Sequence, residues 1–398
     1  MRGYLLRAAG LATIVAAVLF ATVIAAPLMR DPAISDAAPR RTTASTAAEP
    51  AAAATGPVER FTVIASGDVL IHSAVYERAR ANGQAAGRAY DFRPMFRPIR
   101  SIVSKADLAI CHMEVPMGAP GGLSSYPVFN APRQVAAGVR HAGYDTCSTA
   151  SNHSYDKGTP GIHSTIDSLH ARNLRHEGTA KTRRKGNRAA IYRVKGVKVG
   201  HVSFTYGLNG FTLPQGQRWL ANVIDAERII KQARGARRRG ARFVIASLHW
   251  GNEYQRSPSS YQTALARRLM RSRSIDVILG HHAHVVQGIT KVRTRFVAYG
   301  MGNSLSAQYS PVDTQDGVLV KLIVEKIDGR WRVARIRYTP TWVERNTYRI
   351  LPAARVHNQP GTSEALRSVL RASFSRTVAA IRSLGRQKNV RPSEWPKT

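Results

Sequence analysis

The sequence predicts an α/β fold with largely parallel strands, and three observations support this prediction. From Phe61 onward, short runs rich in β-branched residues alternate with segments of helical spacing. Polar residues follow nearly every apolar run, as they do where loops leave the carboxyl ends of parallel strands. The chain has 398 residues, of which 43% are hydrophobic, so it is long and apolar enough to bury a substantial core.

In the first half of this pattern, expected strands and helices alternate. The apolar runs that predict strands are "FTVIAS" (61–66), "DLAIC" (107–111) and "YDTCSTA" (144–150). Helical spacing is found in "MFRPIRSIVSKA" (95–106), "RQVAAGVRHAG" (133–143) and "GIHSTIDSLHARN" (161–173).

The second half repeats the alternation after a β-rich region. Strands are expected within "RAAIYRVKGVKVGHVSF" (188–204) on both sides of Lys195-Gly196, and in "RFVIASLHW" (242–250), "IDVILG" (275–280) and "RFVAYGMGN" (295–303). Helices are expected over 223–238 and 259–272. The segment 318–339 predicts a hairpin with Asp328-Gly329 at its turn.

These elements define a main domain over residues 59–345, followed by a basic, partly helical C-terminal extension over 346–398. Helical spacing in the extension runs from Thr362 to Leu384. We expect this segment to be a solvated surface helix or tail.

The N-terminal segment predicts export. An uncharged stretch from Ala8 to Met29 follows Arg2 and Arg7, and it is long enough to cross the bilayer core, with the basic flank inside. We favour an uncleaved signal anchor over residues 1–29, although "VIA" ending at Ala25 also fits a signal peptide that is removed. Residues 30–58 are rich in Ala, Thr and Pro and predict a flexible linker.

The charge balance favours polyanionic partners. The formal net charge is +35, from 59 Lys and Arg against 24 Asp and Glu, although a compositional bias of the genome explains part of such a balance equally well. Nucleic acid is disfavoured because the chain is expected to be exported and has no basic motif interleaved with aromatic residues. Charge alone does not choose between anionic lipid and acidic polymer, but for an exported chain an anionic polymer of the cell envelope is a better partner than nucleic acid.

Two cysteines, Cys111 and Cys147, each end an apolar run. If those runs are neighbouring strands, the two residues lie close together, and an exported protein permits a disulfide. We favour the alternative, in which both are buried thiols that act as small hydrophobic residues.

Potential metal ligands follow the expected strands. They occur in "SGDVLIH", "CHMEVP", "ASNHSYDKG", "LHWGNEY", "GHHAH" and "GMGNS". Carboxylates, imidazoles and carboxamides are ligands for Zn, Mn, Fe, Mg or Ca. Each motif alone also fits a turn, a loop charge or a helix cap, but six at equivalent positions indicate one site. No nucleophilic serine elbow, activated cysteine or Walker-type phosphate loop competes with this interpretation.

The same residues resemble the CapA family of poly-γ-glutamate capsule biosynthesis proteins, whose PGA_cap domain is similar to the calcineurin-like metallophosphoesterases. The matching segments are "GDVLIH", "DLAICHMEVP", "GYDTCSTASNHSYDKG", "HWGNEY", "GHHAHVVQ" and "YGMGNS", in the family's order and within about 61–343. Two positions depart from the family pattern: His112 and Ser151 stand where the family usually has asparagine. The resemblance implies a metallophosphoesterase-like β-sandwich flanked by helices.

The resemblance also implies a site with two divalent metal ions, Mn, Zn, Fe or Mg. Asp68 and His284 would hold one ion, with His72 completing it, while Asn152, His249 and His282 would hold the other. Glu114 would bridge the two ions, and His153, with Asp156, would form the catalytic pair. The residues expected to line the site or orient the ligands are His112, Glu253, His281 and Asn303.

Such a site supports metal-assisted hydrolysis. We therefore expect an exported, membrane-anchored hydrolase, with its domain outside the cell, that acts in synthesis, modification or export of an anionic polymer such as poly-γ-glutamate, together with a capsule synthesis complex. The alternatives are a secreted protein, and a non-catalytic component that binds and guides the polymer.

Overall fold

The computed structural model describes residues 59–397. The expected anchor or signal peptide (1–29) and the expected linker (30–58) lie outside these residues. Within residues 59–397, no helix combines the length and the apolar composition needed to span a bilayer.

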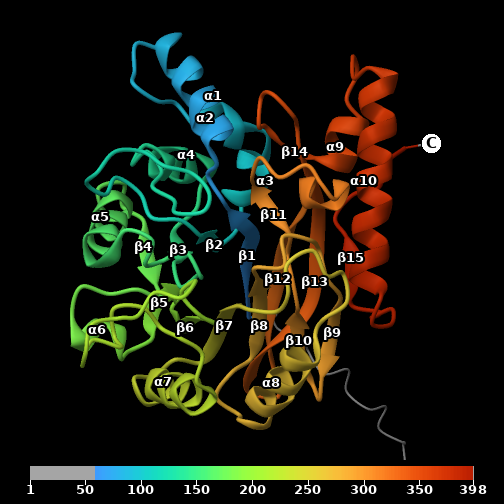
Figure 1. Ribbon diagram of the computed structural model, residues 1–398. Helices are drawn as coiled ribbons and strands as arrows, with labels where there is room; N and C mark the ends of the chain where they lie inside the picture. Colours follow the sequence, from blue (N-terminus) through green and yellow to red (C-terminus); the bar gives the residue numbers. More distant parts are fainter. Residues whose placement is uncertain (1–58, 398) are drawn as a thin grey trace, which may run out of the picture. The chain divides into compact units, whose positions relative to one another are not determined.

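The first of two β-sheets, sheet 1, has a parallel part and an antiparallel part (Figure 1). Its strands follow the order β14-β13-β12-β1-β2-β3-β4, while β11 pairs with β1 and β15 pairs with β13. β1 to β4 and β11 are parallel, and β12 to β14 are antiparallel. The bounds are β1 Arg60–Val69, β2 Leu108–Met113, β3 Thr146–Ser148, β4 Arg175–Glu177, β11 Asn303–Leu305, β12 Asp316–Ile327, β13 Arg330–Val343, β14 Ile350–Pro352 and β15 Val390–Pro392.

Sheet 2 has the order β5-β6-β7-β8-β10-β9. β6, β7, β8 and β10 are parallel, whereas β5 and β9 form antiparallel edges. The bounds are β5 Ala190–Val194, β6 Val197–Thr205, β7 Phe243–His249, β8 Val277–His281, β9 Ile289–Val292 and β10 Arg295–Ala298. The prediction of an α/β fold is confirmed, and its parallel strands form the centre of a mixed architecture.

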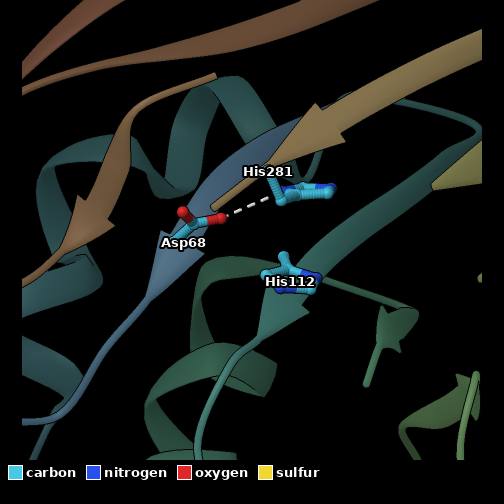
Figure 2. Close-up of side chains that lie close together, drawn as sticks. All are labelled: Asp68, His112 and His281. Carbon is cyan, nitrogen blue, oxygen red and sulfur yellow. Dashed lines mark hydrogen bonds and ion pairs between the residues drawn. The ribbon is translucent and has the colours of Figure 1, made fainter. Parts of the chain in front are cut away.

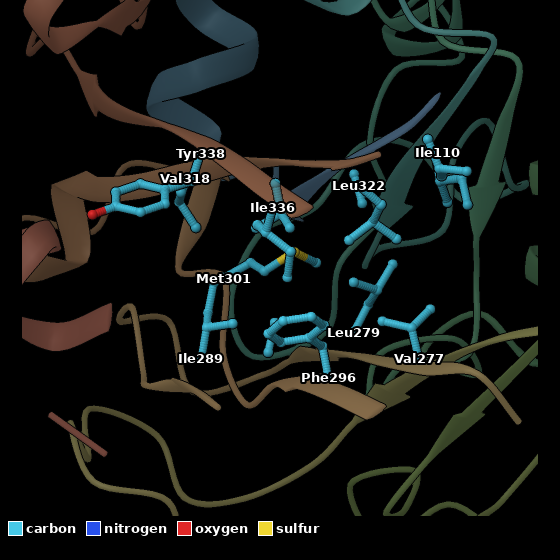
Figure 3. Close-up of a cluster of buried hydrophobic side chains, with 14 of the residues drawn as sticks. Ile110, Val277, Leu279, Ile289, Phe296, Met301, Val318, Leu322, Ile336 and Tyr338 are labelled. Carbon is cyan, nitrogen blue, oxygen red and sulfur yellow. The ribbon is translucent and has the colours of Figure 1, made fainter. Parts of the chain in front are cut away.

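The two sheets pack face to face through alternating apolar side chains. Ile110 of sheet 1 and Val277, Leu279 and Phe296 of sheet 2 belong to one buried cluster, together with Leu322 of the hairpin (Figure 3). Since side chains alternate across a strand, the opposite faces of the same strands remain for helices to cover.

Helices cover both outer faces. The helical segments near the outer face of sheet 1 are α1 Ser73–Gln84, α2 Arg93–Phe96, η1 Arg97–Ile99, α3 Arg100–Val103 and α4 Val135–Ala142. The outer face of sheet 2 packs against α7 Ala226–Arg238 and α8 Ser260–Arg271. The remaining helical segments are α5 Gly158–His170, α6 Arg183–Gly186, η2 Val312–Gln315, α9 Ala353–His357 and α10 Glu364–Arg382.

Local chemistry explains several of the helix boundaries. Asp225 caps α7 by accepting hydrogen bonds from the backbone amides of Glu227 and Arg228. Ser259 and Gln262 form a capping box at the start of α8. Gly143 ends α4 at a φ of 100°, which favours glycine.

The C-terminal extension does not behave as a solvated tail. The expected helix is present as α10, but Leu370, Phe374, Val378 and Ile381 are buried in the same core cluster as the two sheets. Its apolar stripe therefore makes α10 part of the folded unit, which corrects the expectation for this segment.

The two cysteines form a disulfide, which corrects the preference for free thiols. Cys111 on β2 and Cys147 on β3 are paired in register, and their Cα atoms lie 4.4 Å apart. The expectation that they lie close on neighbouring strands is confirmed. The bond closes a separation of 36 residues, so it restricts the unfolded chain.

Candidate metal centre

The candidate ligands lie at the carboxyl ends of strands from both sheets. In sheet 1, Asp68 is paired with His112 and with Asn303, and His112 is paired with Ser148. In sheet 2, His249 is paired with His281. These side chains therefore occupy one level across each sheet, as parallel topology predicts.

Asp68, His112 and His281 form one group of potential ligands (Figure 2). All three are buried, and one ligand atom of each lies within 4.8 Å of the others. Asp68 Oδ1 lies 3.1 Å from His281 Nδ1, and the rings of His112 and His281 stack with their centres 3.9 Å apart. From the sequence, His112 and His281 were expected beside the ligands, and the structure puts both next to Asp68.

Glu114, His282 and His284 form a second group with the same spacing. Glu114 Oε1 lies 3.7 Å from His284 Nε2 and 3.8 Å from His249 Nε2. Glu114 is thus located between residues that the resemblance assigns to different ions.

A chain of hydrogen bonds connects His249 to both sheets. His249 Nδ1 lies 2.9 Å from His112 Nε2, and His112 Nδ1 lies 2.8 Å from Ser148 Oγ. On its other side, His249 Nε2 lies 2.7 Å from Asn152 Oδ1. If Nε2 of His249 binds a metal, Nδ1 carries the proton and donates a hydrogen bond to His112, so this chain fixes the tautomer of the ligand.

His153 and Asp156 are held as a pair beside these groups. His153 Nδ1 lies 2.8 Å from Asp156 Oδ2, which also accepts a hydrogen bond from the Phe129 amide at 2.7 Å. The rings of Phe129 and His153 meet edge to face, with 4.7 Å between their centres. The imidazole is therefore fixed by a carboxylate on one side and by an aromatic ring on the other.

The remaining predicted residues line the edge of the site. His284 Nδ1 lies 3.0 Å from Asn303 Oδ1, and His284 Nε2 lies 3.9 Å from Glu253, whose side chain is partly exposed. His72 accepts a hydrogen bond from the Ala307 amide at 3.3 Å and belongs to neither ligand group among the described residues.

The histidine loop has an unusual backbone. His282 and His284 have φ values of 88° and 56°, in the region that non-glycine residues rarely adopt. Asp68 Oδ2 accepts a hydrogen bond from the His282 amide at 3.0 Å and lies 3.5 Å from His284 Nδ1. Asp68 therefore holds the loop that presents both imidazoles, and such strain is typical of functional sites.

Burial and neighbouring charges give the histidines of the site different protonation states. Burial lowers the pKa of His112 and His249 far below the usual range, and the pKa of His282 to about 3. Burial also opposes protonation of His284, but the carboxylates of Glu114 and Asp68 outweigh it and raise the pKa of His284 to about 9. The neutral imidazoles are in the form that binds metals, whereas a metal must displace a proton from His284.

The two buried carboxylic acids of the site, Asp68 and Glu114, have pKa values shifted in opposite directions. Burial would raise the pKa of Asp68, yet hydrogen bonds with His281 and His284 hold it well below the usual range. Burial raises the pKa of Glu114 well above its usual range, and no hydrogen-bond partner reaches either carboxylate oxygen from the described residues. A buried carboxylate with free lone pairs is costly unless a cation binds it.

These residues fit divalent metal ions. The site combines carboxylates, imidazoles and a carboxamide, and His282 Nδ1 is a further buried atom without a hydrogen-bond partner in the part of the chain described. This donor set suits Zn, Mn or Fe better than Ca, which prefers oxygen ligands alone.

Two residues of the site, Asn209 and Tyr206, were not predicted from the sequence. Asn209 Nδ2 lies 3.3 Å from His153 Nδ1, and Asn209 Oδ1 accepts a hydrogen bond from Asn152 at 3.1 Å. The ring of Tyr206 lies 4.5 Å from that of His282 between centres. Both residues lie in the loop after β6, so reading this strand end like the others could have found them.

A family of bacterial proteins matches the segment that carries the site. Residues 62–308 match the family described as "Bacterial capsule synthesis protein PGA_cap". "Capsule biosynthesis protein CapA" of Bacillus anthracis is 27% identical over 195 residues, which cover 48% of this chain and 47% of the relative. "PGA biosynthesis protein CapA" of Bacillus subtilis (strain 168) is 28% identical over 201 residues, which cover 50% and 52%. The chain thus spans about half the length of these curated relatives.

Solved structures with similar folds share little sequence. The calcineurin-like phosphoesterase YfkN from Bacillus subtilis is 15% identical, with 82% of this chain and 100% of that chain covered and a TM-score of 0.45. A hypothetical protein from Thermus thermophilus is 16% identical, with 70% and 98% covered and a TM-score of 0.43.

Proposed function

The chain belongs to the bacterial capsule synthesis protein PGA_cap family, and we propose that it is a metal-dependent hydrolase that acts on an anionic polymer of the cell surface. The observation that carries the proposal is the presence of two buried ligand groups, one of which contains Glu114, whose two carboxylate oxygens have no hydrogen-bond partner among the described residues. The names of the relatives, which refer to capsule and PGA biosynthesis, support the polymer as substrate.

The proposed site takes two divalent ions, in the manner of metallophosphoesterases. Asp68 and His284 would hold one ion, and His249, His282 and Asn152 would hold the other. Glu114 lies near both His284 and His249, while His281 and His112 lie beside Asp68. When bound, such ions lower the pKa of a water molecule and offset negative charge at the reaction centre.

The protein's own residues have distinct roles in this proposal. Asp156 accepts a hydrogen bond from Nδ1 of His153 and leaves Nε2 to deliver a proton to the leaving group. Asn209 contacts both His153 and Asn152, so it positions the proton donor relative to the ligands.

Glu114→Gln tests the metal requirement. Glutamine keeps the size of the side chain but removes the charge, so we expect metal content to fall from about two ions per chain to less than one. Without metal, the variant should be at least as stable as wild type, because a buried carboxylate that lacks hydrogen-bond partners is removed. Elemental analysis of the full-length chain and thermal unfolding with and without Mn²⁺ measure both effects, with hydrolysis of an aryl phosphate followed on the same samples.

Three results would contradict this proposal. Less than one metal per chain in the wild type would exclude the dinuclear site, and a purely structural Glu114 would give a less stable variant with unchanged metal. Full metal content without turnover of phosphoester, ester or amide probes would favour a non-catalytic polymer-binding component.

The proposal includes export. The Cys111–Cys147 disulfide supports an oxidising compartment, and the stretch from Ala8 to Met29 supports anchoring. Cell fractionation distinguishes the two forms of export, because a shortened soluble chain would mean that the segment is cleaved.

A further inference from the structure

A large basic hollow lies at the end of the sheets opposite to the candidate metal centre. It has a volume of about 940 Å³, and eight arginines and one aspartate are among its lining residues. Arg242 directly precedes β7, whose last residue is His249. A strand of this length places the hollow about 20 Å from the metal centre.

Two of the arginines have structural partners. Arg237 forms an ion pair with Asp276 and donates to the carbonyl of Ser274, and Arg295 donates to the Ser272 carbonyl at 2.7 Å. The other six form no ion pair with any described residue: Arg242, Arg271, Arg273, Arg293, Arg330 and Arg332. Six guanidinium groups around one hollow repel one another unless an anion lies between them.

A second hollow, of about 600 Å³, continues the first. The two share Gly240, Arg242 and Trp331, and the second adds Arg60, Arg193, Lys195, Lys198 and Lys326 with a single acid, Glu59. Lys195 and Lys326 have ionic partners, at 3.1 Å and 2.8 Å, whereas Arg60 and Arg193 form no ion pair in the described part. The two hollows therefore form one elongated basic groove.

The shape of this groove favours a flexible linear ligand. A planar bilayer would meet only the rim of two joined hollows, whereas a polymer chain can enter both. Arginine binds carboxylates through two parallel hydrogen bonds, so a chain with regularly spaced carboxylates satisfies several guanidinium groups at once.

We propose that the basic groove binds a linear polycarboxylate chain, separately from the candidate metal centre. Its role in presenting polymer to that centre rests on the proposed function, but binding itself does not. The groove then retains the chain while another part of it occupies the hydrolytic site.

Charge reversal tests the groove in the full-length chain. We expect R242E/R273E/R332E to bind fluorescently labelled polyglutamate about tenfold more weakly or worse at about 0.15 M salt, with a smaller dependence on salt. The matched control, R78E/R183E/R184E, changes the net charge equally at exposed arginines outside both hollows and should bind within about twofold of wild type. Fluorescence anisotropy measures affinity, and thermal unfolding checks folding. If the triple variant is unstable, R273Q/R332Q should show a smaller loss in the same direction.

Three results separate this proposal from its rivals. If the control variant bound polyglutamate as weakly as the triple variant, binding would depend only on net charge, and the proposed groove would be refuted. If R242E/R273E/R332E no longer bound vesicles rich in phosphatidylglycerol but still bound polyglutamate, the groove would be a membrane-binding surface, and the proposal would be overturned. A wild-type chain that binds polyglutamate through the groove but holds no metal and shows no turnover would refute the proposed hydrolase alone.

Discussion

Asp68→Asn is expected to weaken metal binding strongly and to lower hydrolysis of an aryl phosphate by about a thousandfold. Asp68 contacts His281 and His284 and accepts a hydrogen bond from the His282 amide. Asparagine lacks the charge and turns an NH₂ group toward one of these donors, so both the ligand and the shape of the histidine loop are affected. Values of kcat/KM at saturating Mn²⁺, together with elemental analysis, measure the loss.

The same variant changes the pH dependence. In the wild type, metal must displace the proton from His284, whose pKa is raised to about 9, so affinity should increase by up to about tenfold per pH unit between pH 7 and 9. Loss of the Asp68 charge lowers the pKa of His284 and flattens this increase. Titration of metal into the full chain at several pH values measures the slope.

Asp316→Asn is a matched control for Asp68→Asn. Asp316 is also buried, and it pairs with Arg376 of α10, at 2.7 Å and 2.9 Å. Its replacement should lower the free energy of unfolding by about 2–3 kcal/mol while metal content stays at the wild-type value. If both variants lost metal equally, Asp68 would have only a general role in stability.

His153→Gln is expected to lower kcat by about 10²- to 10⁴-fold with metal content unchanged. His153 belongs to neither metal-binding group among the described residues, and its Nδ1 is held by Asp156. Asp156→Asn should cause a smaller loss, of about 10- to 100-fold, because the imidazole remains but its orientation and tautomer are no longer fixed.

The acid role predicts a dependence on the leaving group. Aryl phosphates with acidic phenols need little protonation, so His153→Gln should affect them less than alkyl phosphates. His170→Gln, at the end of α5, is the control and should match wild type. Loss of metal in His153→Gln, or equal effects on both substrates, would contradict the assignment of His153 as proton donor.

Much of the fold and part of the site could be predicted because they depend on short-range patterns. Asp68, His249 and His281 are each close to the end of an apolar run, and parallel strands bring such ends to one edge. The short apolar runs likewise predicted β1, β2, β7 and β8.

The rest depends on how the two sheets pack. The stacking of His112 on His281 joins residues of different sheets. The residue pattern within a single strand cannot predict such a contact. The arginines of the basic groove likewise come from separate helices, strands and loops, so the sequence showed the net positive charge but not the groove. The apolar stripe of α10 is narrow and interrupted by arginines, so the pattern predicts a solvated surface helix or tail rather than a helix packed on the core.

The disulfide has a consequence for how the site tolerates change. Cys111 and Cys147 directly precede His112 and Ser148, so a covalent bond joins the two neighbouring strands one residue before the hydrogen-bonded pair that supports His249. The disulfide therefore holds the Cα atom of residue 112 in place whichever side chain this position carries. Replacing His112 by asparagine would therefore change the hydrogen bonds that orient the imidazole of His249, while the strands beneath stay in place.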